Sequence, residues 1–263
     1  MMRRFALYSD IHGNSLALDA VLADMTAEGM VERYCLGDLV GYGPDSPGVI
    51  ARVRASEDPV IRGNYDDGVG NRKGQCGCYY GTPEAKEDGE ASYAYTNSVL
   101  SDADHDYLAG LPDEIRFDAE GIRVQLVHGS TRKINEYLMP DRPDSFLGKL
   151  AEEAQADLIC FGHIHIPYHR VVTTPSGRLV HFVSDGSVGK PKDGDPRACW
   201  TEVVIGTAEE IEAFAPLHLA AESVNGACVG VRFHRVAYDV EAVAAAVLAA
   251  GLPPRLAEAL RSA

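Results

Sequence analysis

The chain has 263 residues, is 46% hydrophobic and 24% charged, and carries a formal net charge of −15. Its length and composition are ordinary for a folded protein with one large core, so we expect a single domain over residues 1–263. The acidic excess makes nucleic acid an unlikely partner, because nucleic-acid-binding proteins usually present a basic face.

No apolar run approaches the roughly 20 residues that span a bilayer, so we expect no membrane association. The apolar stretch after Met1-Met2-Arg3-Arg4 is too short for the core of a signal peptide, which favours a cytoplasmic protein. The six scattered cysteines are then expected to be reduced. A homo-oligomer is compatible with the sequence.

The first third of the chain alternates strand and helix patterns. Residues 5–8 predict a buried strand, 16–28 a helix, 33–36 a second strand, 47–54 a helix and 59–61 a third strand. This alternation favours parallel pairing, which collects the carboxyl ends of the strands at one edge. Open α/β sheets bind their ligands at that edge.

Residues 67–90 contain many glycines with little periodicity and predict an irregular excursion, before helices at 91–100 and 102–108. Within the excursion, Cys76-Gly77-Cys78 is weak evidence for a metal site, because a structural zinc site needs four ligands.

The second half is rich in strands. Residues 114–117 and 122–127 predict a hairpin around Glu120-Gly121, followed by a helix at 146–154. Further strands are expected at 158–161, 168–173, 178–183, 199–205, 211–216 and 228–235, and an alanine-rich helix at 240–249.

The first strand leads directly into a group of polar residues. If the strand geometry persists for two more residues, Asp10 and His12 point the same way, because side chains of an extended chain alternate. Gly13 permits a turn, and Asn14 or Ser15 can cap the helix that follows. A carboxylate beside an imidazole is half of a divalent-metal site.

Four other apolar runs also end in possible metal ligands. A single histidine after a strand is usually a packed or surface residue. Five groups of nitrogen and oxygen donors at strand ends are difficult to explain separately, so a metal centre is the leading hypothesis. The groups are Asp10 with His12, Asp38, Asn64, His128, and His163 with His165.

This ordered set resembles the calcineurin-like metallophosphoesterase superfamily, in particular its small prokaryotic phosphodiesterase-like branch. The matching blocks span residues 10–165, about 60% of the chain. They read Asp10-Ile11-His12, Gly37-Asp38, Gly63-Asn64-Tyr65-Asp66, His128-Gly129 and Gly162-His163-Ile164-His165, and the runs Gly186-Ser187-Val188-Gly189 and 193–197 are also similar. The resemblance implies an α/β fold, a four-layer αββα sandwich of two mixed β-sheets flanked by helices.

The resemblance also implies how the ligands divide. Asp10, His12, Asp38 and His165 would hold one metal ion, and Asn64, His128 and His163 a second ion, with Asp38 bridging the two. This donor set suits two divalent ions, Mn²⁺, Fe²⁺, Zn²⁺ or Ni²⁺, and the absence of thiolates argues against a purely structural zinc.

The implied reaction is metal-dependent hydrolysis of a phosphodiester or nucleotide-type phosphate bond in a small substrate. A hydroxide bridging two metal ions would be the nucleophile, since metal binding lowers the pKa of water to about 7. The alternative is a non-catalytic or weakly catalytic binding scaffold on the same fold. Because this sequence retains every metal-ligand position of the family pattern, the enzyme is favoured over the scaffold.

Asn64, Tyr65 and His128 are the candidate catalytic residues, and Tyr65 departs from the family pattern. The family has a histidine there, thought to protonate the leaving group, whereas a tyrosine titrates near 10 and donates less readily at neutral pH. This substitution favours diesters and phosphoanhydrides over alkyl monoesters. Tyr65 packing beside Asn64 with no catalytic role is an equal alternative.

Several other residues have two interpretations each. A helix cap is at least as good an account of Asn14 as support of Asp10, and a turn carboxylate is the simpler account of Asp66. Solvated surface charge is favoured over phosphate contact for Arg132 and Lys190. Stacking on a nucleobase is a further hypothesis for Tyr42 and Tyr79.

Overall fold

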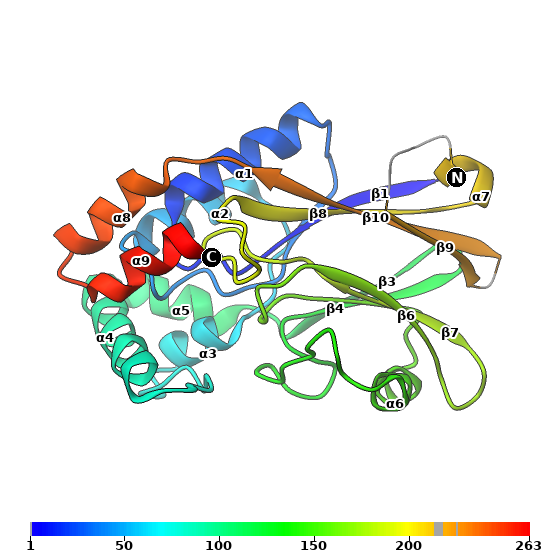
Figure 1. Cartoon of the computed structure of the whole chain (residues 1–263), viewed down its shortest axis with the longest axis horizontal. Helices are drawn as coiled ribbons and strands as arrows, with labels where there is room; N and C mark the ends of the chain where they lie inside the picture. Colours follow the sequence, from blue (N-terminus) through cyan, green and yellow to red (C-terminus); the bar gives the residue numbers. More distant parts are fainter. Residues whose placement is uncertain (1, 213–217, 225) are drawn as a thin grey trace.

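The computed structural model describes residues 2–212, 218–224 and 226–263, which form two mixed β-sheets lying face to face (Figure 1). The first sheet has the strand order β2-β1-β8-β10-β9, and the second has the order β3-β4-β5-β7-β6. The strands are β1 (Arg3–Tyr8), β2 (Arg33–Cys35), β3 (Glu114–Ala119), β4 (Ile122–Val127), β5 (Leu158–Phe161), β6 (Tyr168–Thr173), β7 (Leu179–Ser184), β8 (Ala198–Gly206), β9 (His218–Val224) and β10 (Ala227–Val236).

Helices cover the outer faces of both sheets, which completes the four-layer α/β sandwich. Most of them gather beside the first sheet and at one end of the molecule, whereas α6 lies against the second sheet (Figure 1). The helices are α1 (Ser15–Ala27), α2 (Ser46–Ser56), α3 (Asn64–Gly70), α4 (Pro83–Val99), α5 (Asp102–Gly110), α6 (Asp144–Ala154), α7 (Ala208–Glu212), α8 (Val240–Ala249) and α9 (Pro254–Ser262). No described helix has the length and apolar character needed to cross a bilayer.

The alternation of side chains along β1 explains how two cores form on its two faces. Phe5 and Leu7 belong to the core between the sheets, together with residues such as Leu126 of the second sheet. Tyr8 belongs to the core beneath the helices, where Leu18 of α1 also packs. Burying both faces of a strand in this way requires a nearly continuous apolar run, which β1 has.

The pairing brings the carboxyl ends of several strands to one edge. Strand β1 runs parallel to β2, with Tyr8 opposite Cys35. In the second sheet β4 pairs in parallel with β5, and β5 pairs in parallel with β7. Parallel neighbours end on the same side, so the loops that follow these strands meet there.

The structure confirms the predicted fold class and most of the predicted helices and strands. The predicted strands at 158–161 and 168–173 and the predicted helix at 240–249 coincide with β5, β6 and α8. Asn14 caps α1, since its side-chain oxygen accepts a hydrogen bond from the amide of Ala17.

Three expectations about elements are wrong, and the sequence did not indicate every helix. The third strand at 59–61 is reduced to a single bridge between Val60 and Cys35. The excursion at 67–90 is irregular only between α3 and α4, because a Thr82 cap and a proline in the first turn begin α4 at residue 83. Residues 211–212 close the short helix α7, and residues 213–216 of the same predicted strand lie outside the described residues. The amphipathic helix α9 was not predicted.

Candidate metal centre

The seven residues implied as ligands converge at the edge where these strands end. Asp10, His12 and His165 form one group of side chains that could hold a metal ion, and the ligand atoms of the group lie within 4.8 Å of one another. Asp38, His128 and His163 form a second group by the same criterion. The remaining residue, Asn64, places its Oδ1 3.1 Å from Nε2 of His128. The five sequence blocks that carry these residues therefore come together as two adjacent groups of donor side chains.

Asp38 faces both groups. Its Oδ2 atom lies 3.7 Å from Nε2 of His12 in the first group and 3.4 Å from Nε2 of His128 in the second. Its other oxygen, Oδ1, accepts a hydrogen bond of 2.8 Å from the amide of Tyr65. One oxygen is thus fixed by the backbone, and the other points to the space between the groups.

The backbone at the ligands is left-handed, contrary to the expectation for the first block. Asp10 and His12 have φ angles of 52° and 50°, so the strand geometry ends at Tyr8 and does not persist through them. Asp38, His163 and His165 also have positive φ. Non-glycine residues seldom adopt this conformation, and where they do it is concentrated at functional sites.

Three histidines are oriented by backbone carbonyl groups. Nδ1 of His12 donates to the carbonyl of Val40 at 2.9 Å, and Nδ1 of His128 donates to that of Leu36 at 2.7 Å. Nδ1 of His165 is bonded in the same way to the carbonyl of Lys190. A proton held on Nδ1 leaves the Nε2 lone pair facing the centre, which is the arrangement typical of metal-binding histidines.

Two buried atoms at the centre have no hydrogen-bond partner among the described residues, Oδ1 of Asp10 and Nε2 of His163. The other oxygen of Asp10 accepts a bond of 2.9 Å from the amide of His163. Buried polar atoms are normally paired, because leaving one unpaired costs about 1–3 kcal/mol. One unpaired atom in each donor group, in a set of carboxylates, imidazoles and an amide, fits divalent metal ions well.

The ionisable groups of the centre shift one another's pKa values. Burial alone would lower the pKa of His128, but the carboxylates of Asp38 and Asp10 raise it to about 10, so a bound metal ion would take the place of its Nε2 proton. Burial lowers the pKa of His163 to about 4 and that of His165 to about 3, which keeps both rings neutral at pH 7. Neutral imidazoles are the form that binds metal ions.

Asp66 holds the loop that carries Asp38. Its carboxylate accepts hydrogen bonds from the amides of Asp38 at 2.8 Å, Leu39 at 2.9 Å and Gly63 at 2.9 Å. Burial and the neighbouring Asp38 raise the pKa of Asp66 to about 7. Asp66 therefore links two of the sequence blocks, a role larger than that of a turn carboxylate.

Tyr65 lines the recess over the centre and is fully buried. Its ring centroid lies 5.5 Å from that of His12 and 4.9 Å from that of Tyr42. Burial raises the pKa of Tyr65 well above its ordinary value of 10, which makes it a weak proton donor at neutral pH.

The same recess is also lined by residues that the sequence analysis did not assign to the site. Cys78, Tyr137 and Lys192 line it, and the thiol of Cys78 accepts a 3.2 Å hydrogen bond from the amide group of Asn64. Their positions depend on loop paths, and no spacing in the sequence indicates them.

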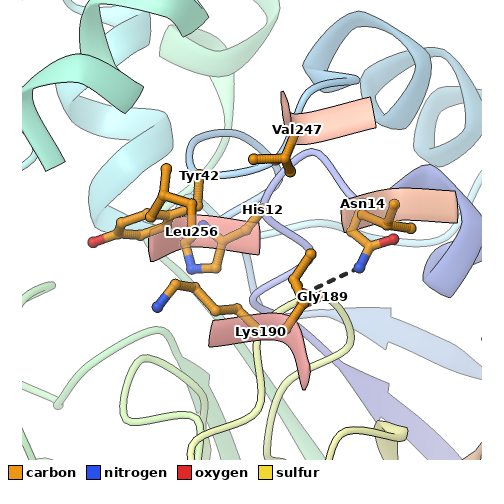
Figure 2. Close-up of a pocket in the computed structure, with 10 residues that line it drawn as sticks. His12, Asn14, Tyr42, Gly189, Lys190, Val247 and Leu256 are labelled. Atoms are coloured by element: carbon orange, nitrogen blue, oxygen red, sulfur yellow. Dashed lines mark hydrogen bonds between the residues drawn. The ribbon is translucent and has the colours of Figure 1, made fainter. Parts of the chain in front are cut away.

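The structure shows which of the residues with two interpretations lie at the recess and which lie elsewhere. Tyr42 lines the recess, whereas Tyr79 is 79% exposed and does not line it. Arg132 does not line the recess; it forms an ion pair with Glu136 at 2.7 Å, which agrees with the favoured interpretation as a surface charge. Lys190, in contrast, lies beside the centre, as Figure 2 shows, and burial lowers its pKa to about 7.

Comparison with known proteins agrees with this geometry. A family model described as the calcineurin-like phosphoesterase superfamily domain matches residues 2–209. The uncharacterised protein MJ0912 of Methanocaldococcus jannaschii is 30% identical over 210 residues, which cover 74% of this chain and 80% of that protein.

Two crystal structures are similar over nearly the whole chain. A metallophosphoesterase from Sphaerobacter thermophilus has a TM-score of 0.69 at 27% identity, with 98% of each chain covered. The hypothetical protein PH1004 from Pyrococcus horikoshii OT3 shares the fold, with a TM-score of 0.74 at 22% identity over 98% of this chain and 97% of that one. Because the family model spans most of the sequence, the chain belongs to the calcineurin-like phosphoesterase superfamily.

Proposed function

We propose that this chain is a dinuclear metal-dependent phosphoesterase that hydrolyses phosphodiester or nucleotide-type phosphate bonds. The observation that supports the proposal most directly is the pair of adjacent donor groups, in which backbone carbonyls fix Nδ1 of His12, His128 and His165. Family membership supports the phosphoesterase chemistry, and the donor geometry supports two ions.

In this proposal Asp10, His12 and His165 hold one divalent ion, Asn64, His128 and His163 hold the other, and Oδ2 of Asp38 serves both. Two such ions would supply a hydroxide near neutral pH and neutralise charge on the phosphoryl oxygens. The donor set suits Mn²⁺, Fe²⁺, Zn²⁺ or Ni²⁺.

The residues around the centre favour substrates with a good leaving group. Tyr65 replaces the histidine that resemblance to the family would place there, and its raised pKa makes proton donation to an alkoxide inefficient. Phenolate, nucleotide or phosphate leaving groups depart without that help. We therefore favour phosphodiesters and phosphoanhydrides over alkyl monoesters.

The test is turnover of bis-p-nitrophenyl phosphate with Mn²⁺ by the wild type and by the His128→Ala and His163→Ala variants. Since removing only a supporting partner of a ligand typically costs 10–100-fold in affinity or activity, loss of the ligand itself should cost at least about 100-fold. His169→Ala, which changes a histidine of β6 outside the recess, is the matched control.

The His163→Ala variant distinguishes a loss of catalysis from a loss of the folded structure. Nε2 of His163 has no partner among the described residues, so removing the ring sacrifices no hydrogen bond made by that atom in the metal-free protein. The ring packs against Tyr137 with a centroid distance of 4.2 Å, so we expect a lower Tm, but a native circular dichroism spectrum and cooperative unfolding of the metal-free variant. Bound metal should fall below two ions per chain. Equal turnover by all four proteins would exclude the proposed enzyme and favour a binding scaffold.

A further inference from the structure

The segment between β7 and β8 places two lysines beside the metal centre. Lys190 lines a recess together with His12 and Tyr42, and its side chain extends alongside these rings in Figure 2. Lys192 lines the neighbouring recess with His163 and His165. The two lysines therefore line neighbouring recesses that share His12 and Tyr42.

The backbone of this segment is fixed to the ligands. The carbonyl of Lys190 accepts the bond from His165 described above, and the amide of Lys192 donates to the carbonyl of His165 at 3.1 Å. The amide of Gly189 donates to the carbonyl of Asp10 at 3.0 Å, and a Cβ at Gly189 would come within 1.7 Å of the carbonyl oxygen of Ile11. Only glycine fits there, so the lysine stems start from fixed positions.

The two ammonium groups have no carboxylate partner within the described part of the chain. Lys73 and Lys86 pair with Asp67 and Glu90, but neither Lys190 nor Lys192 forms an ion pair. The Lys190 ammonium lies over the ring of Tyr42, 4.7 Å from its centroid, a contact that positions a cation without neutralising it. Burial lowers the pKa of Lys190 to about 7 in the ligand-free protein, and an anion bound beside it would favour the charged ammonium form.

The charge at the site exceeds what one phosphoryl group requires. Two divalent ions, the carboxylates of Asp10 and Asp38 and a hydroxide would leave about one positive charge, which already offsets the single negative charge of a phosphodiester. Two ammonium groups beyond this complement further anionic oxygens, for which lysine is a common ligand.

We propose that Lys190 and Lys192 form a subsite that binds a second phosphate group of the substrate, next to the one that is hydrolysed. This inference rests on the proposed function and narrows its substrates to compounds with linked phosphoryl groups. The anhydride-linked group enters between the lysines while the first group lies at the metal centre.

The experiment compares two substrates in four variants of the Mn²⁺-loaded protein. P1,P2-diphenyl pyrophosphate has two linked phosphoryl groups, and bis-p-nitrophenyl phosphate has one. Lys190→Met and Lys192→Met remove the charges, Lys192→Arg retains one, and Lys149→Met removes an exposed charge on α6 as the matched control. Calorimetric titration with diphenyl methylenediphosphonate, which cannot be hydrolysed at the bridge, measures binding independently of turnover.

A hydrogen bond to a charged group commonly contributes tenfold or more to affinity. We expect each Met variant at the subsite to raise KM for the pyrophosphate and Kd for the diphosphonate at least tenfold. The loss of kcat/KM for bis-p-nitrophenyl phosphate should be at least tenfold smaller than the loss for the pyrophosphate. Lys149→Met should resemble the wild type, and Lys192→Arg should recover most of the affinity for the diphosphonate. Equal losses for both substrates, or no loss for either, would overturn the subsite.

The two proposals can fail separately. If the wild type hydrolyses bis-p-nitrophenyl phosphate but the lysine variants do not discriminate, only the subsite is wrong. If the wild type hydrolyses neither substrate, the proposed function is wrong, and the calorimetric titration still decides whether the lysines bind linked phosphoryl groups.

Discussion

Replacing Asp66 with asparagine tests whether this carboxylate holds the loop of the metal centre. The side chain keeps its size, but an amide has one acceptor oxygen where the carboxylate has two. In the better orientation the amide oxygen retains the bonds from the amides of Asp38 and Gly63, and the amide of Leu39 then faces an NH₂ group. A buried donor without an acceptor costs about 1–3 kcal/mol.

We therefore expect Asp66→Asn to lose about 1–3 kcal/mol of unfolding free energy at pH 4, where Asp66 is protonated in the folded protein. The loss should shrink toward pH 8, because burial and Asp38 raise the pKa of Asp66 to about 7 and its ionisation therefore destabilises the folded wild type. A domain of this size loses roughly 2–4 °C of Tm per kcal/mol, so Tm at pH 4 should fall by about 2–12 °C. Because Asp38 is on the same loop, affinity for metal should also fall at least about tenfold.

The assay is thermal unfolding of the metal-free protein by circular dichroism, with metal affinity measured by titration. Asp102→Asn is the control, since the Asp102 side chain is 91% exposed and pairs only with the exposed Arg72 in the described structure. A Tm within 1 °C of the wild type together with unchanged metal affinity would refute the role assigned to Asp66.

Three further predictions follow from the same geometry. Adding Mn²⁺ at about 100 times its Kd should stabilise the protein by about 2.7 kcal/mol and raise Tm by about 5–11 °C, reversibly with a chelator; an unchanged Tm would contradict the metal centre. Gly63→Ala should reduce bound metal, because its Cβ would meet Oδ1 of Asp38 at 2.1 Å, whereas Gly81→Ala, with nothing within 4 Å, should not. Burial lowers the pKa of His169 to about 4, so its contribution to stability is present above pH 6.5 and is lost as pH falls through 4. His169→Gln should reduce the loss of stability between these pH values by up to about 3 kcal/mol, measured by urea unfolding; an identical pH profile would contradict this.

The sequence predicted the members of the site better than their conformation. Each donor follows an apolar run, and parallel strands end at a common edge, so the convergence of Asp10, Asp38 and His128 follows from simple rules. The left-handed backbone at Asp10 and His12 does not follow, because local preference opposes it in non-glycine residues and tertiary hydrogen bonds impose it.

The errors in secondary structure have similar causes. Glycine-rich composition concealed the first turns of α4, where a cap and a proline determine the start of the helix. Lys192 reaches the recess through a long loop whose path depends on the backbone contacts of Gly189 and His165. Contacts of this kind join residues far apart in the chain, and one sequence carries no signal for them.

The strain at the ligands is compensated by pairing between the two loops that follow β1 and β2. The amide of Asp10 donates to the carbonyl of Gly37 at 2.9 Å, and the amides of Ile11 and His12 donate to that of Asp38 at 2.9 and 3.0 Å. These bonds continue the contact between β1 and β2 beyond the ends of the strands, although the residues have left the extended conformation. A hydrogen bond retained in the interior offsets the cost of about 1–3 kcal/mol for an unusual backbone conformation. The sheet and its loops consequently position the donor atoms before any ion binds. The free energy of metal binding is therefore not reduced by a cost of ordering the chain.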